Sequence, residues 1–277
     1  MGMRISTNVA AINAQRTMNT SQRQIGKSME QLASGSRINK AADDAAGLAI
    51  SENLKSQIRS LSQASRNSND GISMVQTAEG GLSEISNILT RMRELGVQSS
   101  SDTVGDTERG FLNKEVQQLK AESQRITQTT KFGTTKLLDG SADKFDFQVG
   151  IGNDAEADRI SFNAGETNAT TSSLGIDGFD FSSKSGAQEA LKEIDKAQSQ
   201  VNGYRANLGA LQNRLQSTVD NLGVQHENIS AANSRIRDTD VASATADSTR
   251  NQVLLQANTA VLGQANALPN QALRLLG

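Results

Sequence analysis

Few side chains in this sequence could do catalytic or metal-binding chemistry. His226 is the only histidine, and the 277 residues include no cysteine. A helical zinc site needs two histidines four residues apart with a glutamate between them, and Ser–His–Asp catalysis would also have to use His226. Without cysteine there are no thiol nucleophiles, disulfides or thiolate ligands. The sequence therefore predicts a protein that is not an enzyme and that uses no cofactor or metal.

The paired carboxylates and the glycine-rich turn do not change this conclusion. Asp43 and Asp44 precede one expected helix, and Asp238 and Asp240 precede another. Carboxylates at these places are explained more simply as helix caps than as an acid/base pair. The turn Gly150-Ile151-Gly152 lacks the further glycine and the helix start of a phosphate-binding loop.

Composition narrows the range of partners. The net charge is −2 and no basic stretch stands out, which argues against nucleic-acid binding. No stretch is apolar enough to span a membrane, so no membrane insertion is expected. Arg4 is not followed by an apolar region of the kind that signal peptides contain, so we expect any export to proceed without a cleaved signal peptide.

The strongest periodic signal is an apolar stripe in the last third of the chain. Its positions alternate in steps of three and four residues, as in a heptad repeat. The stripe consists of Ile194, Ala197, Val201, Tyr204, Leu208, Leu211, Leu215, Thr218, Leu222, Gln225, Ile229, Ala232 and Ile236. A stripe this long and narrow must pack along another helix. An aromatic content of 3% suits such a thin seam better than a thick globular core.

Helical periodicity and turn residues divide the first half of the chain. Residues 1–34 show a weak heptad pattern, which residues 35–47 interrupt. Residues 48–99 have the pattern of one long helix with a soft spot at Asn67–Gly71, and Ser99–Gly110 is rich in turn residues. Another helix is expected to begin near Asp106 and to run antiparallel to the one before it.

The middle of the chain changes to a period of two residues. Lys144–Val149 and Arg159–Phe162 alternate in this way around a turn at 150–154, which predicts a β-hairpin near 144–164. The segment Thr167–Ser173 is rich in serine and threonine and is expected to be an exposed loop.

Capping signals predict how the last helices begin and end. Ser185 with Gln188 matches a capping box that opens a long helix. Asp238 and Asp240 predict that a new helix starts there. Pro269, the only proline, should kink or restart that last helix.

These elements predict a mainly α protein, a long antiparallel coiled-coil helical rod with a small β-hairpin region in the middle of the chain. Both ends are weakly amphipathic and would be marginal helices alone in water. We therefore expect them to fold on assembly with each other and with neighbouring copies. Their predicted subunit-packing stripe is Ile25, Leu32, Leu254, Val261, Leu268 and Leu275.

Many short motifs, in order along the chain, resemble bacterial flagellin. In the first half they are Ile5–Ala11, Ser34–Asn39, Asp43–Ser51, Asn69–Ser73, Gln76–Gly80 and Arg91–Gln98; in the second half they are Asn202–Leu208, Ser234–Asp238 and Gln256–Leu276. The resemblance covers both ends and the short middle. Departures from the usual pattern occur at Gln31, at Ala33–Ser36 and at Gly96.

The resemblance implies a structural subunit that polymerises into the flagellar filament used for swimming. Residues 1–42 and 238–277 would then be inner-tube helices, and residues 43–237 a rod domain, in a short form that lacks most of the variable outer domains. A hook–filament junction protein has similar helical ends and is the alternative, but the closeness of both ends to flagellin favours the filament. An unrelated coiled-coil scaffold would have no reason to carry the ordered motifs.

The resemblance also implies partners and a location. The partners would be further copies of the chain, the flagellar cap, the junction proteins and an export chaperone, and the location would be the extracellular filament. In many flagellins an innate receptor of animals recognises a surface that corresponds here to Arg91, Leu95, Gln98, Glu115 and Glu122. If the filament is glycosylated, we expect O-linkage in the loop at residues 167–173.

Overall fold

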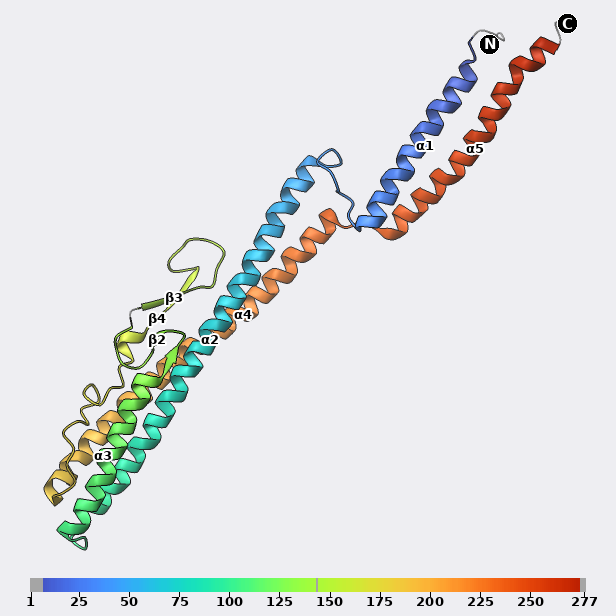
Figure 1. Cartoon of the computed structure of the whole chain (residues 1–277). Helices are drawn as coiled ribbons and strands as arrows, with labels where there is room; N and C mark the ends of the chain where they lie inside the picture. Colours follow the sequence, from blue (N-terminus) through green and yellow to red (C-terminus); the bar gives the residue numbers. More distant parts are fainter. Residues whose placement is uncertain (1–6, 143, 275–277) are drawn as a thin grey trace. The chain divides into compact units, whose positions relative to one another are not determined.

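A computed structural model describes residues 7–142 and 144–274, with side chains up to residue 267 in the last helix. Its helices are α1 (Val9–Ser34), α2 (Ala45–Ser99), α3 (Asp106–Thr129), α4 (Lys184–Arg237) and α5 (Val241–Arg274) (Figure 1). The chain forms two compact units. Unit 1 consists of residues up to 58 and from 228 onward, and unit 2 of residues 59–227. The predicted mainly α fold with long antiparallel helices and a small hairpin region is confirmed.

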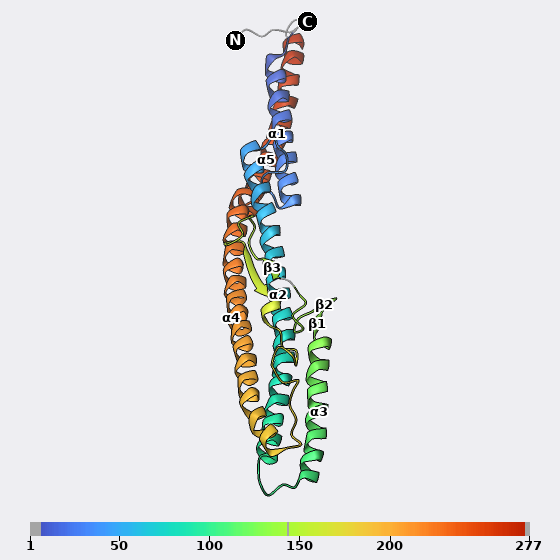
Figure 2. The same cartoon turned by 90° about the vertical axis from the view of Figure 1, so that its left-hand side faces the viewer.

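Unit 2 is built around the antiparallel packing of α2 and α4. The side chain of Arg93 contacts that of Asp195 at 2.8 Å, and Ser86 accepts a hydrogen bond from Gln198 at 2.6 Å. Residue numbers therefore rise along α2 as they fall along α4, so the two helices are antiparallel. In Figure 2, α2 lies between α4 and α3.

Two heptad stripes meet in the core of unit 2. On α2 the fully buried apolar positions are Val75, Ala78, Leu82, Ile85, Leu89 and Met92; on α4 they are Ala187, Ile194, Ala197, Val201, Leu208 and Leu215. The spacing of three and four residues keeps both stripes turned inward over many turns. The stripe predicted on α4 is buried as far as Leu222, apart from the half-buried Tyr204 and Thr218. Gln225, the next position, is exposed.

Short strands lie between α3 and α4. β3 (Lys144–Gln148) pairs with β4 (Arg159–Asn163) in an antiparallel register that sets Phe145 opposite Phe162 and Phe147 opposite Ile160. This confirms the predicted hairpin. β1 (Lys131–Phe132) and β2 (Thr135–Lys136) form a smaller hairpin whose turn contains Gly133 at φ +60°, a conformation that glycine adopts without strain. The 3₁₀ turn η1 (Ala164–Glu166) follows β4.

The segment Thr167–Ser173 is not the exposed loop that its composition suggests. Thr167 and Ala169 are buried, and Thr171 is 8% exposed, while Ser172 and Ser173 remain exposed. The backbone N–H of Ala169 donates to the carbonyl of Leu138, and both the N–H and the hydroxyl of Thr171 donate to Gln124 Oε1. The segment therefore covers the core, and the prediction of an exposed loop was wrong because these short polar side chains find partners inside the unit.

The start of α4 also differs from its prediction. The helix begins at Lys184, and Ser183 Oγ accepts a hydrogen bond from the backbone N–H of Gly186 at 3.2 Å. Ser183 is thus the N-cap, and the capping box predicted from Ser185 was placed two residues too late. Ser182, Ser183 and Ser185 all lie near the start, and the sequence pattern alone did not separate them.

The carboxylates near the other helix starts act largely as predicted. Asp44 accepts from the N–H of Gly47 in the first turn of α2, and Asp240 accepts from the N–H groups of Ala242 and Ser243 in the first turn of α5. α2 continues through Asn67–Gly71 without a break. α5 runs as one helix through Pro269, so the predicted restart at this proline does not occur.

Candidate functional site

The two ends of the chain pair along their length in unit 1. At one end the Asn8 side-chain amide donates to the carbonyl of Ala265 at 2.7 Å, and at the other the N–H of Thr239 donates to the carbonyl of Gly35 at 3.0 Å. α1 and α5 are therefore antiparallel neighbours, as Figure 1 shows. Asn8 also caps α1, because its Oδ1 accepts from the N–H of Ala11.

The seam between α1 and α5 is made mostly of small and polar side chains. On α1 the buried positions are Ala14, Ser21 and Ser28; on α5 they are Ala244, Ser248 and Ala265. Half-buried side chains at the intervening heptad positions are Met18, Ile25 and Leu32 on α1, and Asn251, Leu255, Asn258 and Leu262 on α5. Alanine and serine remove little apolar area from water, so this seam contributes much less stability than the core of unit 2.

Large apolar side chains of these two helices remain in contact with solvent. They are Val9, Ile12 and Met29 on α1, and Val241, Val253, Leu254 and Val261 on α5, each 44–60% exposed. Scattered exposed apolar residues are normal, but larger groups of them mark interaction surfaces. We call this set the exposed apolar set.

The predicted packing stripe is divided between the seam and the surface. Ile25 and Leu32 face α5, whereas Leu254 and Val261 lie outside the seam. On α5 their next neighbours Leu255 and Leu262 face α1 instead, and each heptad offers two adjacent apolar residues that the sequence pattern could not distinguish. The side chain of Leu268 and the whole of Leu275 lie outside the described residues. Packing of Leu254 and Val261 against another subunit stays a prediction.

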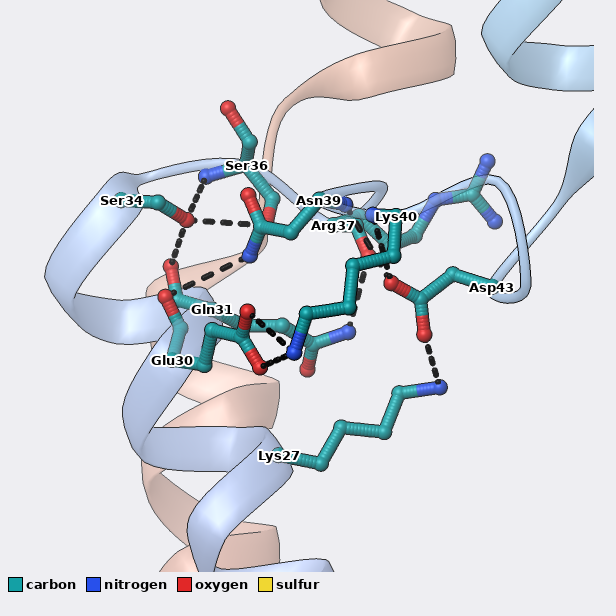
Figure 3. Close-up of polar contacts among 9 residues, drawn as sticks. All are labelled: Lys27, Glu30, Gln31, Ser34, Ser36, Arg37, Asn39, Lys40 and Asp43. Atoms are coloured by element: carbon teal, nitrogen blue, oxygen red, sulfur yellow. Dashed lines mark hydrogen bonds and ion pairs between the residues drawn. The ribbon is translucent and has the colours of Figure 1, made fainter.

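The segment from residue 35 to residue 44, here called the tie loop, connects α1 to α2 and folds back onto the last turns of α1 (Figure 3). Lys27 Nζ lies 2.9 Å from Asp43 Oδ1, and Lys40 Nζ lies 2.9 Å from Glu30 Oε1. The Gln31 amide donates to the carbonyl of Arg37 at 3.0 Å. Polar side chains of α1 therefore hold one side of the tie loop.

The other side of the tie loop is held by the turn between α4 and α5. The N–H of Arg37 donates to the carbonyl of Arg237 at 2.6 Å, and its guanidinium donates to the carbonyl of Ile236 at 2.8 Å. Ser36 and Asp238 form an antiparallel bridge. Ile38 is 1% exposed, so the tie loop also has an apolar anchor.

The residues predicted as a receptor surface belong to α2 and α3, and they are only partly exposed. Arg91, Gln98 and Glu115 are exposed, and Arg91 forms ion pairs with Glu94 and Glu115, both at 2.9 Å. The hydrogen bonds that Arg91 donates to these two carboxylates, Glu94 first, raise the pKa of Arg91. These side chains form one charged cluster across the two helices.

Leu95 and Glu122 do not match the predicted surface equally well. Leu95 is 1% exposed and belongs to the core of unit 2, so its prediction as a surface residue was wrong. The heptad stripe of α2 contained the signal, since Leu95 follows Met92 by three residues. Glu122 is half-buried and pairs with Arg125 at 2.6 Å, and the hydrogen bond from Arg125 lowers the pKa of Glu122.

Sequence reasoning missed two exposed apolar residues near this cluster. Phe111 is 62% exposed with Lys114 Nζ 5.6 Å from its ring centre, and Val97 is 53% exposed. The available signal was their position one residue off the stripes of α3 and α2, beside Leu112 and Gly96.

The described residues hold no group of three or more histidine, cysteine, aspartate or glutamate side chains that could bind a metal ion. Among the helices of the described part of the chain, none is both long enough and apolar enough to cross a membrane. What the structure does offer is paired terminal helices with uncovered apolar side chains, on a chain of long antiparallel helices. Long antiparallel helices with uncovered apolar side chains are typical of helical structural proteins.

Comparison with known proteins gives the family. The model of the bacterial flagellin N-terminal helical region matches residues 5–143, and that of the bacterial flagellin C-terminal helical region matches residues 191–276. The chain therefore belongs to the bacterial flagellin family, whose members are structural subunits of the flagellar filament.

Individual relatives agree with this assignment. A flagellin of Halalkalibacterium halodurans is 47% identical over 274 residues, which cover 99% of this chain and 100% of the relative. The flagellin of Bacillus subtilis is 41% identical over 304 aligned residues, with 99% of this chain and 100% of the relative covered. A flagellar filament core protein of Brachyspira hyodysenteriae is 40% identical, again over 99% of this chain and 100% of the relative.

Solved structures share the fold. The crystal structure of Bacillus cereus flagellin aligns with a TM-score of 0.51 and 31% identity, over 61% of this chain and 94% of that one. A putative flagellar hook-associated protein from Vibrio parahaemolyticus aligns with a TM-score of 0.60 over 71% of this chain and 100% of that one. Its identity of 14% indicates a shared fold alone, so it does not favour the junction-protein alternative.

Proposed function

We propose that this chain polymerises into the flagellar filament through the exposed apolar set of α1 and α5, with these helices forming the inner tube. The observation that carries the proposal is that the terminal helices bury alanine and serine against each other and leave valine, leucine, isoleucine and methionine side chains 44–60% exposed. In a single copy of the chain these larger apolar side chains are therefore available to contact neighbouring copies. Residues 1–42 and 238–277 would line the tube, and the rest of the chain would surround it.

The energetics favour assembly of many copies over pairing of two. Covering a half-exposed side chain of this size contributes roughly 1 kcal/mol. Association costs about 4–15 kcal/mol, so several such side chains on each copy must be covered together. Contacts that join two different faces of successive copies form a ring only if the rotation between copies closes. Otherwise they continue from copy to copy as a helical filament.

The family membership supports further partners and a route. We infer that the chain reaches the extracellular filament by export without a cleaved signal peptide. An export chaperone would cover the apolar ends before assembly, the cap would guide their pairing, and the junction proteins would connect the filament to the hook. Catalysis forms no part of the proposal.

Cryo-electron microscopy of the purified full chain, after seeding or salting-out, tests this proposal. The expected result is helical filaments in which both terminal helices are ordered around a central channel and Leu254 contacts a neighbouring copy. A closed oligomer, or a monomer that never elongates on seeds, would contradict the proposal and favour the junction-protein alternative.

A second function, recognition by the animal innate flagellin receptor, is supported by the exposed cluster of Arg91, Gln98 and Glu115. Arg91→Ala should reduce receptor activation by monomeric protein at least tenfold, because it removes the charge that Glu94 and Glu115 hold in place. Arg250→Ala, which breaks an exposed ion pair with Asp247 on α5, is the matched control. Activation that is unchanged by Arg91→Ala in a reporter-cell assay would rule out this site.

A further inference from the structure

The two sides of the tie loop are held by different kinds of contact. Toward the α4–α5 turn, the N–H of Arg37 donates to the carbonyl of Arg237, and the N–H of Thr239 donates to the carbonyl of Gly35. These backbone bonds carry no net charge, and the Arg37 guanidinium on this side donates to a neutral carbonyl, that of Ile236. Toward α1, the principal contacts are the ion pairs Lys27–Asp43 and Lys40–Glu30.

The ion pairs are open to solvent. The side chains of Lys27 and Asp43 are 48% and 21% exposed, and those of Lys40 and Glu30 are 67% and 44% exposed. Salt at physiological concentration screens such exposed pairs, whereas it has little effect on a hydrogen bond between uncharged groups. The two sides of the tie loop must therefore respond differently to ionic strength.

We propose that the tie loop is an ionic latch, in which the Lys27–Asp43 and Lys40–Glu30 pairs hold the last turns of α1 and release them when these charges are screened or neutralised, while the loop stays bonded to the α4–α5 turn. The inference concerns a single copy and does not depend on the proposed filament function.

Neutral contacts on the α1 side are too weak to replace the ion pairs. The Gln31 amide donates to the carbonyl of Arg37, and the Asn39 amide donates to the carbonyl of Glu30 at 3.4 Å. Ser34 Oγ accepts from the N–H of Ser36 at 3.1 Å and lies 3.3 Å from the carbonyl oxygen of Ser36. All of these bonds are exposed, so water can take the place of either partner at little cost. With the charges screened, these bonds alone leave the end of α1 free to fray.

Asp43 connects α1 to the backbone of the tie loop. Its Oδ1 accepts from Lys27, and its Oδ2 accepts from the N–H groups of Asn39 at 3.3 Å and Lys40 at 3.1 Å. The Lys27 hydrogen bond, followed by the N–H of Lys40, lowers the pKa of Asp43. The other charged groups nearby are Glu30 on α1, Arg37, Lys40 and Asp44 in the loop, Arg237 and Asp238 on the α4–α5 turn, and Glu52 on α2.

The direction of the pH effect follows from this shift. A carboxyl group with a lowered pKa in the folded state stabilises that state above its unfolded pKa, and the stabilisation is lost as pH falls through the folded pKa. Acid should thus open the latch by protonating Asp43, which removes its ion pair with Lys27. Lys40, whose pKa is raised mainly by its hydrogen bond with Glu30, should lose its contribution only at strongly alkaline pH.

Hydrogen exchange of backbone amides in the full chain tests the latch. The double variant Lys40→Gln/Asp43→Asn neutralises both ion pairs from the loop side and leaves the sequence of α1 unchanged. The reporters are the amides of residues 31–34 at the end of α1, compared with those of Arg37 and Thr239 on the backbone side. The control is Asp247→Asn/Arg250→Gln, which removes an exposed ion pair of 2.9 Å on α5.

The expected result has two parts. In low salt the double variant should lower the protection of amides 31–34 by roughly three- to tenfold and leave Arg37 and Thr239 within about twofold, while the control changes neither. Raising the salt from about 20 mM to 500 mM should produce the same loss in the wild type and little further change in the double variant.

Three outcomes would overturn the proposal. The first is loss of protection at Arg37 and Thr239 in step with residues 31–34, which would mean that the loop melts as one piece. The second is unchanged protection at residues 31–34 in the double variant. The third is an absence of wild-type protection at residues 31–34 in the unassembled protein at low salt. Assembly into filaments is measured separately, by sedimentation of the same samples. Failure of the latch and failure of the filament function are therefore distinguishable.

Discussion

Leu254→Asp should abolish polymerisation of the full chain and leave unit 2 folded. Leu254 is 44% exposed and lies outside the seam with α1, so the change costs the isolated copy little. In a polymer the same position would be covered by a neighbour, where a buried unpaired carboxylate is far more costly than the leucine it replaces. We expect the critical concentration for assembly to rise by about a hundredfold or more, since each 1.4 kcal/mol is a factor of ten.

Seeded assembly followed by sedimentation at a series of protein concentrations measures this effect. Gln256→Asp is the matched control, because it places the same charge on an exposed position of α5 that is not apolar. Circular dichroism and thermal unfolding of both variants show whether unit 2 is intact. Normal assembly of the Leu254→Asp protein would remove Leu254 from the proposed interface, and equal failure of both variants would indicate general intolerance of charge on α5.

Phe181→Ala should cause one of the largest losses of stability that a single substitution can produce here. Phe181 is among the largest fully buried side chains, and its ring stacks on that of Phe179 with centroids 6.4 Å apart. Its backbone is also fixed, because the carbonyl accepts from Ser99 Oγ and the N–H donates to Asn113 Oδ1. The residue therefore connects the loop before α4 to both α2 and α3.

The expected loss in the free energy of unfolding is about 3–5 kcal/mol, the usual range for removing a buried aromatic ring. In a cooperative unit of this size each kcal/mol lowers Tm by roughly 2–4 °C, so the transition of unit 2 should fall by about 6–20 °C. Differential scanning calorimetry measures the shift. Phe132→Ala, at a side chain that is 39% exposed, is the control and should change Tm by only a few degrees. Similar shifts for both variants would show that Phe181 does not anchor the core.

The long helices and the β3–β4 hairpin could be predicted because their patterns repeat many times. On α4 the stripe from Ile194 to Leu222 offers one consistent apolar face, and the alternation in steps of two predicts the two strands of the hairpin. Over such lengths a single ambiguous residue does not change the result.

The α1–α5 seam could not be predicted in the same way. Ser21, Ser28 and Ser248 are buried in it, and a search for apolar residues passes over them. The adjacent pairs Leu254–Leu255 and Val261–Leu262 fit the heptad spacing equally well in two registers, and only packing against α1 selects one. Leu95 was misplaced for a different reason, since the resemblance to a family gave its role without its burial.

The uniform small side chains of the seam have a consequence for how α1 finds its place. Ala14, Ser21 and Ser28 are spaced by seven residues and are nearly equal in size, so a shift of α1 by one heptad, about 10 Å along the axis, would present almost the same surface to α5. The seam alone therefore specifies direction but not position. The position of α1 along α5 is set at the two ends of the seam. There the Asn8 side-chain amide donates to the carbonyl of Ala265, and the N–H of Thr239 donates to the carbonyl of Gly35. The register of α1 on α5 is therefore determined only at the two ends of the seam. A change at either end should allow α1 to slip along α5, whereas a change in the middle of the seam should not.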